Sequence, residues 1–160
     1  MKLRAYEDGD IQDMMEIWNH IVVEEGDSFP QMNGLSLSEA RNFFAGQSHC
    51  GVAEMDGKVA GFYILHPNNV GRCGHIGNTS YAVAPNLRGK GIGRRLVEDS
   101  INQAKEHGYG LLQFNAVVKT NEGAIRIYEQ LGFQRLGIIP KGFYMKAGYY
   151  EDIILYYLEL

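Results

Sequence analysis

The segment from residue 73 to residue 118 constrains the fold more than any other part of the sequence. It reads as an apolar strand over 73–83, a glycine-rich turn, an amphipathic helix that Gly108 ends, and a strand over 111–118. A strand, a helix and a strand joined by short turns form a crossover unit whose two strands run in the same direction. The sequence therefore predicts a parallel strand pair, and LLQFNAVV is apolar enough to be buried on both faces.

The remaining segments add helices and antiparallel strands. Asp56-Gly57 between two apolar runs predicts a tight hairpin, and Pro140 and several glycines predict a loop over 137–148. The order of elements is strand, two helices, three strands, helix, strand, helix and two strands. This order predicts an α+β (mixed α/β) fold with a mostly antiparallel sheet flanked by helices. The other expected elements are a strand at 2–6, a helix over 11–22 capped by Asp8 or Asp10, a helix from Ser36 or Ser38 to 45, a helix from Asn121 to 131, and strands at 133–136 and 149–158.

Length and composition limit the class of protein. The 160 residues, with a mass of 18.0 kDa, suit one domain over 1–160. No segment approaches the roughly 18 apolar residues of a membrane span, and the N-terminus turns acidic before any signal-peptide core, so we expect a cytoplasmic protein. A formal net charge of −4 argues against binding to nucleic acid in bulk. Cys50 and Cys73 lack metal-ligand spacing, which leaves no metal site expected.

The segment NLRGKGIGRRL, residues 86–96, places three glycines among four cations in this acidic chain. A Walker phosphate loop is excluded because Lys90 is followed by Gly91 rather than by a hydroxyl residue. A dinucleotide fingerprint is excluded because Arg94 stands where a glycine is required. Glycines let successive N–H groups converge, and a helix start carries partial positive charge. The pattern therefore favours a pyrophosphate, with a solvated basic helix start as the alternative.

The same segment closely resembles the acyl-CoA-binding segment of the GNAT acetyltransferases, whose pattern is Arg or Gln, two residues, Gly, one residue, and Gly or Ala. Arg88, Gly91 and Gly93 occupy that pattern. NEGAIRIYEQLGF, residues 121–133, resembles the family's second block, and the element order agrees along essentially the whole chain. The resemblance implies a GNAT fold with a twisted sheet, a splayed parallel pair, and acetyl-CoA as co-substrate. The cofactor-binding residues that it implies are Tyr81, Ala82, Val83, Arg88, Gly89, Lys90, Gly91, Ile92, Gly93, Arg94 and Asn121.

The resemblance also implies the reaction. The pantetheine arm would pair with the strand end near Tyr81 to Val83, and a backbone N–H near Val83 would stabilise the oxyanion. Tyr128 stands where many family members place the general acid that protonates the leaving thiolate. The alternative is that Tyr128 is a core aromatic residue of an apolar helix. Asn121 would cap that helix and contact the cofactor arm.

The acceptor side rests on two asparagines. The segments HIGNTSY, with Asn78, and QFN, with Asn115, resemble a GNAT branch that includes fungal acetyltransferases of small cyclic imino acids. In that branch, amides from these strands bind the substrate carboxylate, although its members often have tryptophan where Tyr128 stands. An asparagine buried in an apolar strand such as that of Asn115 needs hydrogen-bond partners. The alternative is that both are core amides that satisfy the backbone.

Other acceptor-side residues carry less specific signals. His75, placed in the strand over 73–83, and Glu24, Glu25 and Asp27, placed in the loop between the first two helices, are candidate bases, and a base acting through ordered water is equally plausible. The segment GFYMKAGYY, residues 142–150, includes Lys146 and suits a lid over a small acceptor or the subunit interface of a homodimer equally well.

The resemblance thus implies an N-acetyltransferase that moves an acetyl group from acetyl-CoA to the amine of a small molecule. The amine would attack directly, without a metal or a covalent enzyme intermediate. Two alternatives stay open, namely acetylation of protein N-termini or lysines and a catalytically idle acyl-CoA sensor. The acidic balance of the chain disfavours a nucleic-acid-binding module.

Overall fold

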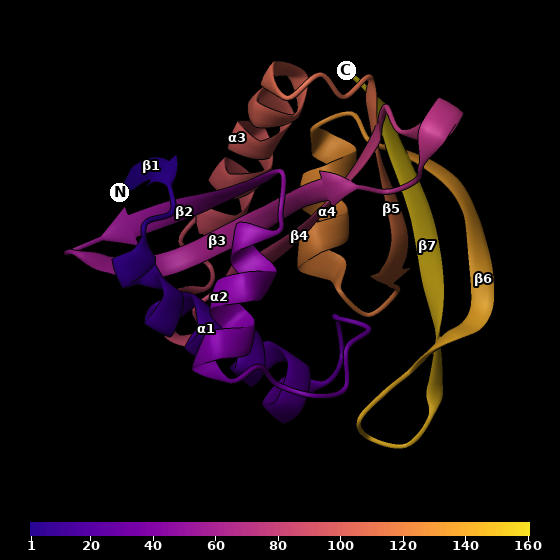
Figure 1. Ribbon diagram of the computed structural model, residues 1–160. Coiled ribbons are helices and arrows are strands. Elements are labelled where there is room, and N and C mark those ends of the chain that lie inside the picture. Colours follow the sequence, from indigo (N-terminus) through magenta and orange to yellow (C-terminus); the bar gives the residue numbers. More distant parts are fainter.

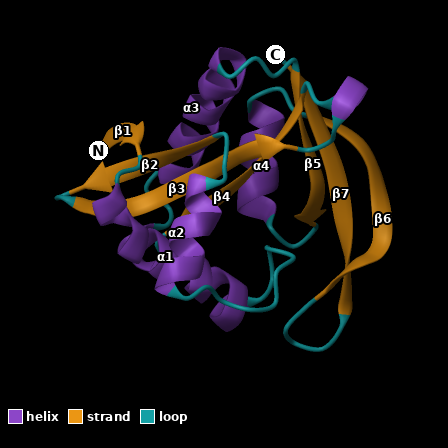
Figure 2. Ribbon diagram, viewed as in Figure 1, coloured by secondary structure: helices purple, strands orange, loops and turns teal.

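The computed structural model describes residues 1–160 as one seven-stranded sheet with helices on both faces (Figures 1 and 2). The strand order is β1-β2-β3-β4-β5-β7-β6, and only β4 and β5 pair in parallel, so the predicted mixed α/β fold is confirmed. None of the helices is long and apolar enough to cross a bilayer. The elements are β1 (Lys2–Ala5), α1 (Ile11–Asn19), α2 (Leu37–Ala45), β2 (His49–Met55), β3 (Lys58–Pro67), β4 (Ile76–Val83), α3 (Ile92–Glu106), β5 (Leu111–Val118), α4 (Glu122–Gln130), β6 (Gln134–Tyr144) and β7 (Tyr150–Glu159).

Strand β3 shows how the sheet divides the core into two layers. Successive side chains of a strand point to opposite faces. Phe62 and Ile64 therefore pack with α1 and α2, whereas Tyr63 and Leu65 pack with α3 on the other face. Seven consecutive residues of β3 are buried, which fits a central strand covered on both sides.

The parallel pair separates soon after it begins. Strands β4 and β5 pair only at Ile76 with Leu111 and at Gly77 with Leu112. Beyond these pairs, β5 continues beside β7, with an extra residue bulged out after Phe114. The predicted splay of the two strands is therefore present, and it opens a gap between their carboxyl ends.

Several local predictions are confirmed by backbone geometry. Asp56 and Gly57 have φ values of 51° and 75°, the left-handed pair that a tight hairpin turn requires. Ser36 caps α2 by accepting a hydrogen bond from the N–H of Glu39 at 3.2 Å. Gly108 follows α3 with φ of 82°.

The loop predicted over 137–148 is wrong, because β6 continues to Tyr144. Proline disrupts a central strand because it has no N–H to donate to a neighbouring strand. Strand β6 lies at the edge of the sheet, and Pro140 falls in a bulge relative to β7, so the missing N–H is tolerated there. The segment predicted as a lid, 142–150, is divided between the ends of β6 and β7 and the turn that joins them. Only 145–149 form the turn between β6 and β7.

Two element boundaries also differ from the prediction. Strand β4 begins at Ile76, because Gly71–Cys73 form a 3₁₀ turn, and His75 therefore lies in a turn rather than in the strand. The first helix extends beyond α1 as a π-helix over His20–Glu25. Glu24 and Glu25 consequently belong to helical structure and not to the inter-helix loop.

Candidate active site

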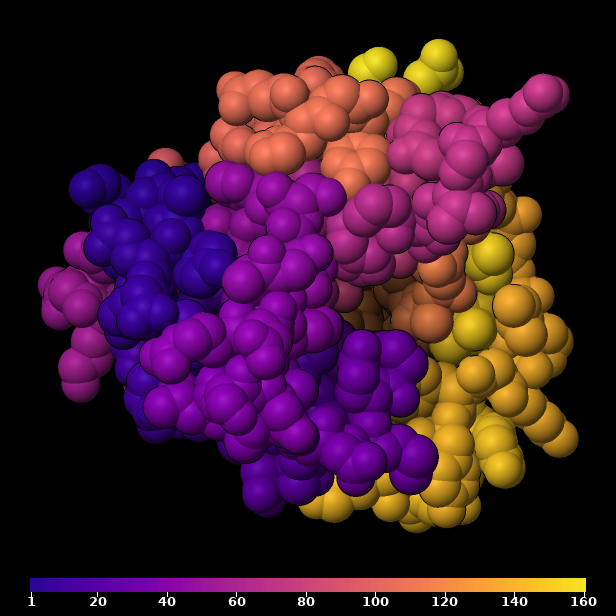
Figure 3. Space-filling view, viewed as in Figure 1, coloured from indigo at the N-terminus to yellow at the C-terminus, as the bar shows by residue number.

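A cavity of about 660 Å³ opens where β4 and β5 separate. Its walls come from these two strands, the starts of α3 and α4, the π-helix and the segment 27–30 that follows it. In the space-filling view it is the dark hollow beside this segment (Figure 3). The cavity lies where a ligand can be inserted between the strands.

The structure brings most of the predicted site residues to this cavity. Ala82 and Lys90 are the exceptions: the Ala82 side chain packs in the core beneath α1 and α2, and Lys90 is exposed outside the cavity. Of the four candidate bases, Glu25 and Asp27 line the cavity, whereas Glu24 and His75 do not. The predicted residues that line it are Asn78, Tyr81, Val83, Arg88, Gly89, Gly91, Ile92, Gly93, Arg94, Asn115, Asn121 and Tyr128.

The glycine turn presents unused backbone donors to the cavity. Gly89 and Gly91 have φ values of 77° and 79°, in the left-handed region that favours glycine. The N–H groups from Gly89 to Arg94 donate no hydrogen bond to the rest of the chain. The first turn of α3 adds the positive end of the helix dipole at the same place. This arrangement is a nest for an anion.

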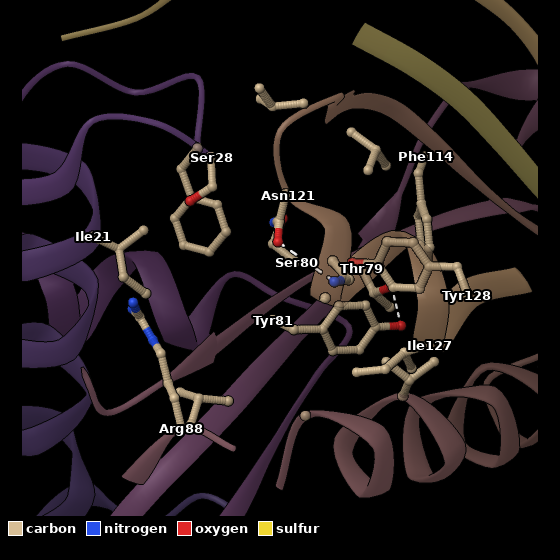
Figure 4. A pocket seen from close by; sticks show the side chains of 18 of the residues that line it. Ile21, Ser28, Thr79, Ser80, Tyr81, Arg88, Phe114, Asn121, Ile127 and Tyr128 are labelled. Atoms are coloured by element: carbon tan, nitrogen blue, oxygen red, sulfur yellow. Dashed lines mark hydrogen bonds between the residues drawn. The ribbon is translucent and has the colours of Figure 1, made fainter. Parts of the chain in front are cut away.

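The cations around the nest are not all free. The Arg88 guanidinium donates to both carboxylate oxygens of Glu25, at 2.6 and 3.0 Å, and Nε2 of His20 lies 3.2 Å from the same carboxylate. Arg94 pairs with Glu98 at 2.9 Å on α3. Figure 4 shows Arg88 directed toward Ile21, on the side of the cavity opposite the tyrosines. The backbone, rather than the Arg88 side chain, is therefore the main donor of the nest.

The edge of β4 that faces the gap carries free backbone groups. The carbonyl of Ile76, at the start of β4, accepts from the N–H of Asn68, which follows β3. The N–H of Ala84, just after β4, donates to the carbonyl of Ala60 in β3. Alternate residues of an antiparallel pair bond to the same neighbour, so the even-numbered residues of β4 are used by β3. Ala82 therefore offers neither its side chain nor its backbone to the cavity. The residues whose N–H and C=O groups face the gap are Thr79, Tyr81 and Val83.

Tyr128 lies on α4 within an aromatic cluster. Its ring centroid is 4.7 Å from that of Phe114 and 6.0 Å from that of Tyr81. Burial raises the pKa of the Tyr128 phenol above its usual value, and neighbouring tyrosines raise the pKa further. The Tyr128 hydroxyl has no hydrogen-bond partner in the protein, although the residue lines the cavity. The Tyr128 phenol is thus protonated and can donate a hydrogen bond to a ligand in the cavity.

The hydroxyl of Tyr81 is occupied in a different way. It accepts from Thr79 Oγ1 at 2.6 Å and lies 2.7 Å from Ser100 Oγ of α3. Burial raises the pKa of Tyr81 to about 12, against the lowering effect of these two bonds. The two rings lie side by side in Figure 4, but only Tyr128 has an unused hydroxyl.

Asn121 caps α4 as predicted. Its Oδ1 accepts a hydrogen bond from the N–H of Ala124 at 3.4 Å, and the residue lines the cavity. Figure 4 places Asn121 between the aromatic cluster and Ser28. The side-chain Nδ2 remains available to a bound molecule.

The prediction that Asn115 is buried is wrong. Its strand is covered on both faces only in part, because the separation from β4 leaves Asn115 exposed to the gap. Asn115 and Asn78 nevertheless come together, since both bond to Asn68. Asn68 follows β3 and carried no signal in the sequence, where HPNNVGR reads only as a loop.

A contact between the segment after the π-helix and the β6–β7 turn also escaped prediction. The N–H of Lys146 donates to the carbonyl of Gly26 at 3.0 Å, and its Nζ donates to the carbonyl of Glu24 at 2.9 Å. These residues are about 120 positions apart, so no local pattern could reveal the pairing. The contact holds the β6–β7 turn against a segment in which Glu25 and Asp27 line the cavity.

The fold matches that of solved N-acetyltransferases along nearly the whole chain. A GCN5-related N-acetyltransferase from Kribbella flavida superposes with a TM-score of 0.91, covering 99% of this chain and 97% of that chain at 30% identity. The yncA structure from Salmonella typhimurium, solved with its cofactor acetyl-CoA, superposes with a TM-score of 0.88, covering 100% and 94% at 24% identity. The fold is therefore that of this enzyme class.

Sequence comparison gives the same class. The N-acetyltransferase aca1 of Schizosaccharomyces pombe is 32% identical over 154 residues, covering 84% of this chain and 74% of that protein. The model of the acetyltransferase (GNAT) family matches residues 11–133. The chain belongs to the GNAT acetyltransferase family.

Proposed function

We propose that this acetyltransferase moves an acetyl group from acetyl-CoA to the amine of a small molecule, by direct attack within a ternary complex. The observation that carries the proposal is the unused row of N–H groups from Gly89 to Arg94, beside the free edge of β4. A pyrophosphate fits the first and an extended amide-containing arm fits the second. Coenzyme A carries both groups in one molecule.

The cofactor would therefore lie along the gap. Its pyrophosphate would accept hydrogen bonds from the backbone between Gly89 and Arg94, and its pantetheine arm would pair with Tyr81 and Val83. Asn121 would donate from its free Nδ2. Ala82 has no part in this arrangement, and Lys90 contributes only its backbone N–H. The thioester then reaches the point where β4 and β5 separate.

The reaction follows from the groups at that point. The lone pair of the neutral amine attacks the thioester carbon, and the oxyanion accepts a hydrogen bond from the N–H of Val83. When the tetrahedral intermediate collapses, the C–S bond breaks and Tyr128 donates its proton to the sulfur. The proton released by the amine leaves to water, and the Tyr128 phenolate takes a proton from solvent before the next turnover. The oxyanion and the leaving sulfur are thus both served by donors that the protein leaves unpaired.

A small, carboxylate-bearing acceptor suits the other end of the cavity. Asn78 and Asn115 line it and have amide N–H groups left over after their bonds to Asn68. A carboxylate accepts such bonds well. The Lys146 contact with Gly26 holds the β6–β7 turn beside the segment with Glu25 and Asp27, which line the cavity, whereas a peptide acceptor needs an open groove.

A screen for acetyl-CoA-dependent thiol release tests the proposal. We expect turnover with free amino or imino acids, and less with polyamines or with peptides of several residues. Turnover restricted to peptides would replace the small-molecule acceptor with a protein one. Acetyl-CoA binding without turnover on any amine would indicate a sensor.

Because of the Lys146 contact, we expect a substitution at Gly26 to change the KM for the acceptor. A Cβ at Gly26, whose φ is 58°, would lie 2.6 Å from Cβ of Lys146. Gly26→Ala should therefore push the β6–β7 turn away, with a raised KM for the acceptor and an unchanged Kd for acetyl-CoA. The clash should lower the free energy of unfolding by about 1–3 kcal/mol more than backbone strain alone does.

Gly148→Ala is the matched control for this variant. Gly148 lies in the β6–β7 turn with φ of 95°, but a Cβ there meets no atom within 4 Å. Both variants carry left-handed strain, and only Gly26→Ala carries the clash. Steady-state kinetics give the KM for the acceptor, and chemical denaturation gives the free energy of unfolding of each variant. Equal KM values in the two variants would mean that the Lys146 contact has no role in acceptor binding.

A further inference from the structure

We propose that Asn68 is a positioning residue that holds Asn78 and Asn115 with amide N–H groups directed to the cavity, and that it thereby sets a preference for carboxylate-bearing acceptors. The inference rests on the proposed function, because it concerns the acceptor end of the same cavity. Asn78 and Asn115 line the cavity, but Asn68 does not. Asn68 therefore acts through the other two amides.

Asn68 occupies a fixed place behind the gap. It directly follows β3, and its N–H donates to the carbonyl of Ile76 at 2.8 Å, at the start of β4. Its side chain is half-buried and reaches both Asn78 on β4 and Asn115 on β5. It thus bridges the two strands beyond the last residues that pair them directly, Gly77 and Leu112.

The side chains of Asn68, Asn78, Asn115 and Gln113 form an amide cluster, and its hydrogen bonds use up the carbonyl oxygens of two members. Oδ1 of Asn68 accepts from Nδ2 of Asn78 at 3.0 Å and from Nδ2 of Asn115 at 2.6 Å. Oδ1 of Asn115 accepts from Nδ2 of Asn68 at 3.3 Å and from Nε2 of Gln113 at 3.1 Å. An amide oxygen has two lone pairs, so both oxygens are saturated.

The remaining capacity of the cluster is mostly that of a donor. Each Nδ2 carries two hydrogens and uses one, so Asn78 and Asn115 each keep one N–H. Asn115 has no free acceptor left. A ligand group that meets Asn115 must therefore accept a hydrogen bond. A carboxylate offers two accepting oxygens, whereas a carboxamide offers one and an NH₂ that can only donate. Without Asn68, the Asn78 side chain loses its only hydrogen bond and Asn115 keeps only the one from Gln113, so both amides are less firmly oriented.

The experiment compares acceptors that differ in this one group. For wild type and for Asn68→Ala, kcat and KM are measured with L-proline and L-prolinamide, and with every other amino acid that the screen turns over and its carboxamide. We expect Asn68→Ala to raise KM for the carboxylate by about tenfold, as when one hydrogen bond to a charged group is lost. The KM for the carboxamide and the kcat should change little, so the preference for the carboxylate shrinks.

Two further variants separate positioning from general damage. Asn69→Ala is the matched control, since Asn69 is exposed and its side chain bonds only to the N–H of Val70 at 2.8 Å. It should keep the wild-type preference. Asn68→Ala should have a smaller effect in an Asn115→Ala background than in wild type, because only the bond to Asn78 is then left to lose and residues of one network are not additive. Additive effects would mean that Asn68 does not act through Asn115.

The outcomes distinguish this inference from the proposed function. Turnover of amino acids with the same carboxylate preference in Asn68→Ala and wild type would overturn the role of Asn68 and leave the proposed function standing. Equal use of acid and carboxamide by the wild type would overturn the carboxylate site itself, and the role of Asn68 with it. A loss of preference confined to Asn68→Ala supports both.

Discussion

Gly91→Ala should weaken acetyl-CoA binding by about 100-fold or more, because each hydrogen bond from a backbone N–H to a phosphate contributes about 1.5–3 kcal/mol. The φ of 79° at Gly91 is costly for any residue with a Cβ, so alanine would turn the backbone away from this geometry. The N–H groups from Gly89 to Arg94 would then no longer converge on one anion. Isothermal titration calorimetry with acetyl-CoA and with CoA measures the loss.

Gly108→Ala is the matched control for that experiment. Gly108 follows the other end of α3 with φ of 82°, and neither glycine has an atom within 4 Å of an added Cβ. Both variants therefore carry similar strain on the same helix, but Gly108 is remote from the cavity lining. If both variants bind acetyl-CoA with wild-type affinity, the nest does not hold the pyrophosphate.

Tyr128→Phe should lower kcat by about 10²- to 10³-fold, within the range that general acid catalysis contributes. The Kd for acetyl-CoA should change little, because the ring and its packing against Phe114 remain. The hydroxyl has no partner in the protein, so its removal leaves no buried group unsatisfied and should not unfold the protein. Steady-state kinetics with a saturating acceptor measure the effect.

The control is Tyr156→Phe. Tyr156 is fully buried, 6.0 Å from the Tyr128 ring, and its hydroxyl donates to Glu129 at 2.8 Å outside the cavity. It should lose some stability and keep its kcat. Full activity of Tyr128→Phe would instead assign the proton to water and leave Tyr128 as a core aromatic residue.

The pH dependence of kcat checks the same role. An acid must be protonated to act, and activity is lost as pH rises through its pKa. Because burial raises the pKa of Tyr128 above the ordinary tyrosine value of about 10, kcat should show no decline due to this group below about pH 10. A descending limb near neutral pH that disappears in Tyr128→Phe would contradict this.

Local sequence patterns predicted most of the fold. The hairpin at Asp56-Gly57, the cap at Ser36 and the crossover through α3 depend on a few adjacent residues, and all are present. The length of β6 was missed because Pro140 breaks strands except at an edge, and the position of a strand within a sheet is not a local property. The π-helix after α1 had no signal distinct from that of an ordinary helix.

The site was predicted where a motif fixes the backbone and missed where distant side chains meet. The glycine turn is such a motif. The pairing of Arg88 with Glu25 joins residues 63 positions apart, and it turns an expected phosphate ligand toward a carboxylate. Asn68 meets partners 10 and 47 positions away, so only the folded chain reveals the network.

The short pairing of β4 with β5 has a consequence for the mechanics of the molecule. Backbone pairing between the half of the sheet made of β1 to β4 and the half made of β5, β7 and β6 is limited to two residue pairs, and α3 is the covalent connection between the halves. A ligand arm that pairs with β4 would act as a missing strand and complete the sheet. A bound ligand would then reinforce the junction between β4 and β5, so that its binding raises the free energy of unfolding as well as preparing the reaction.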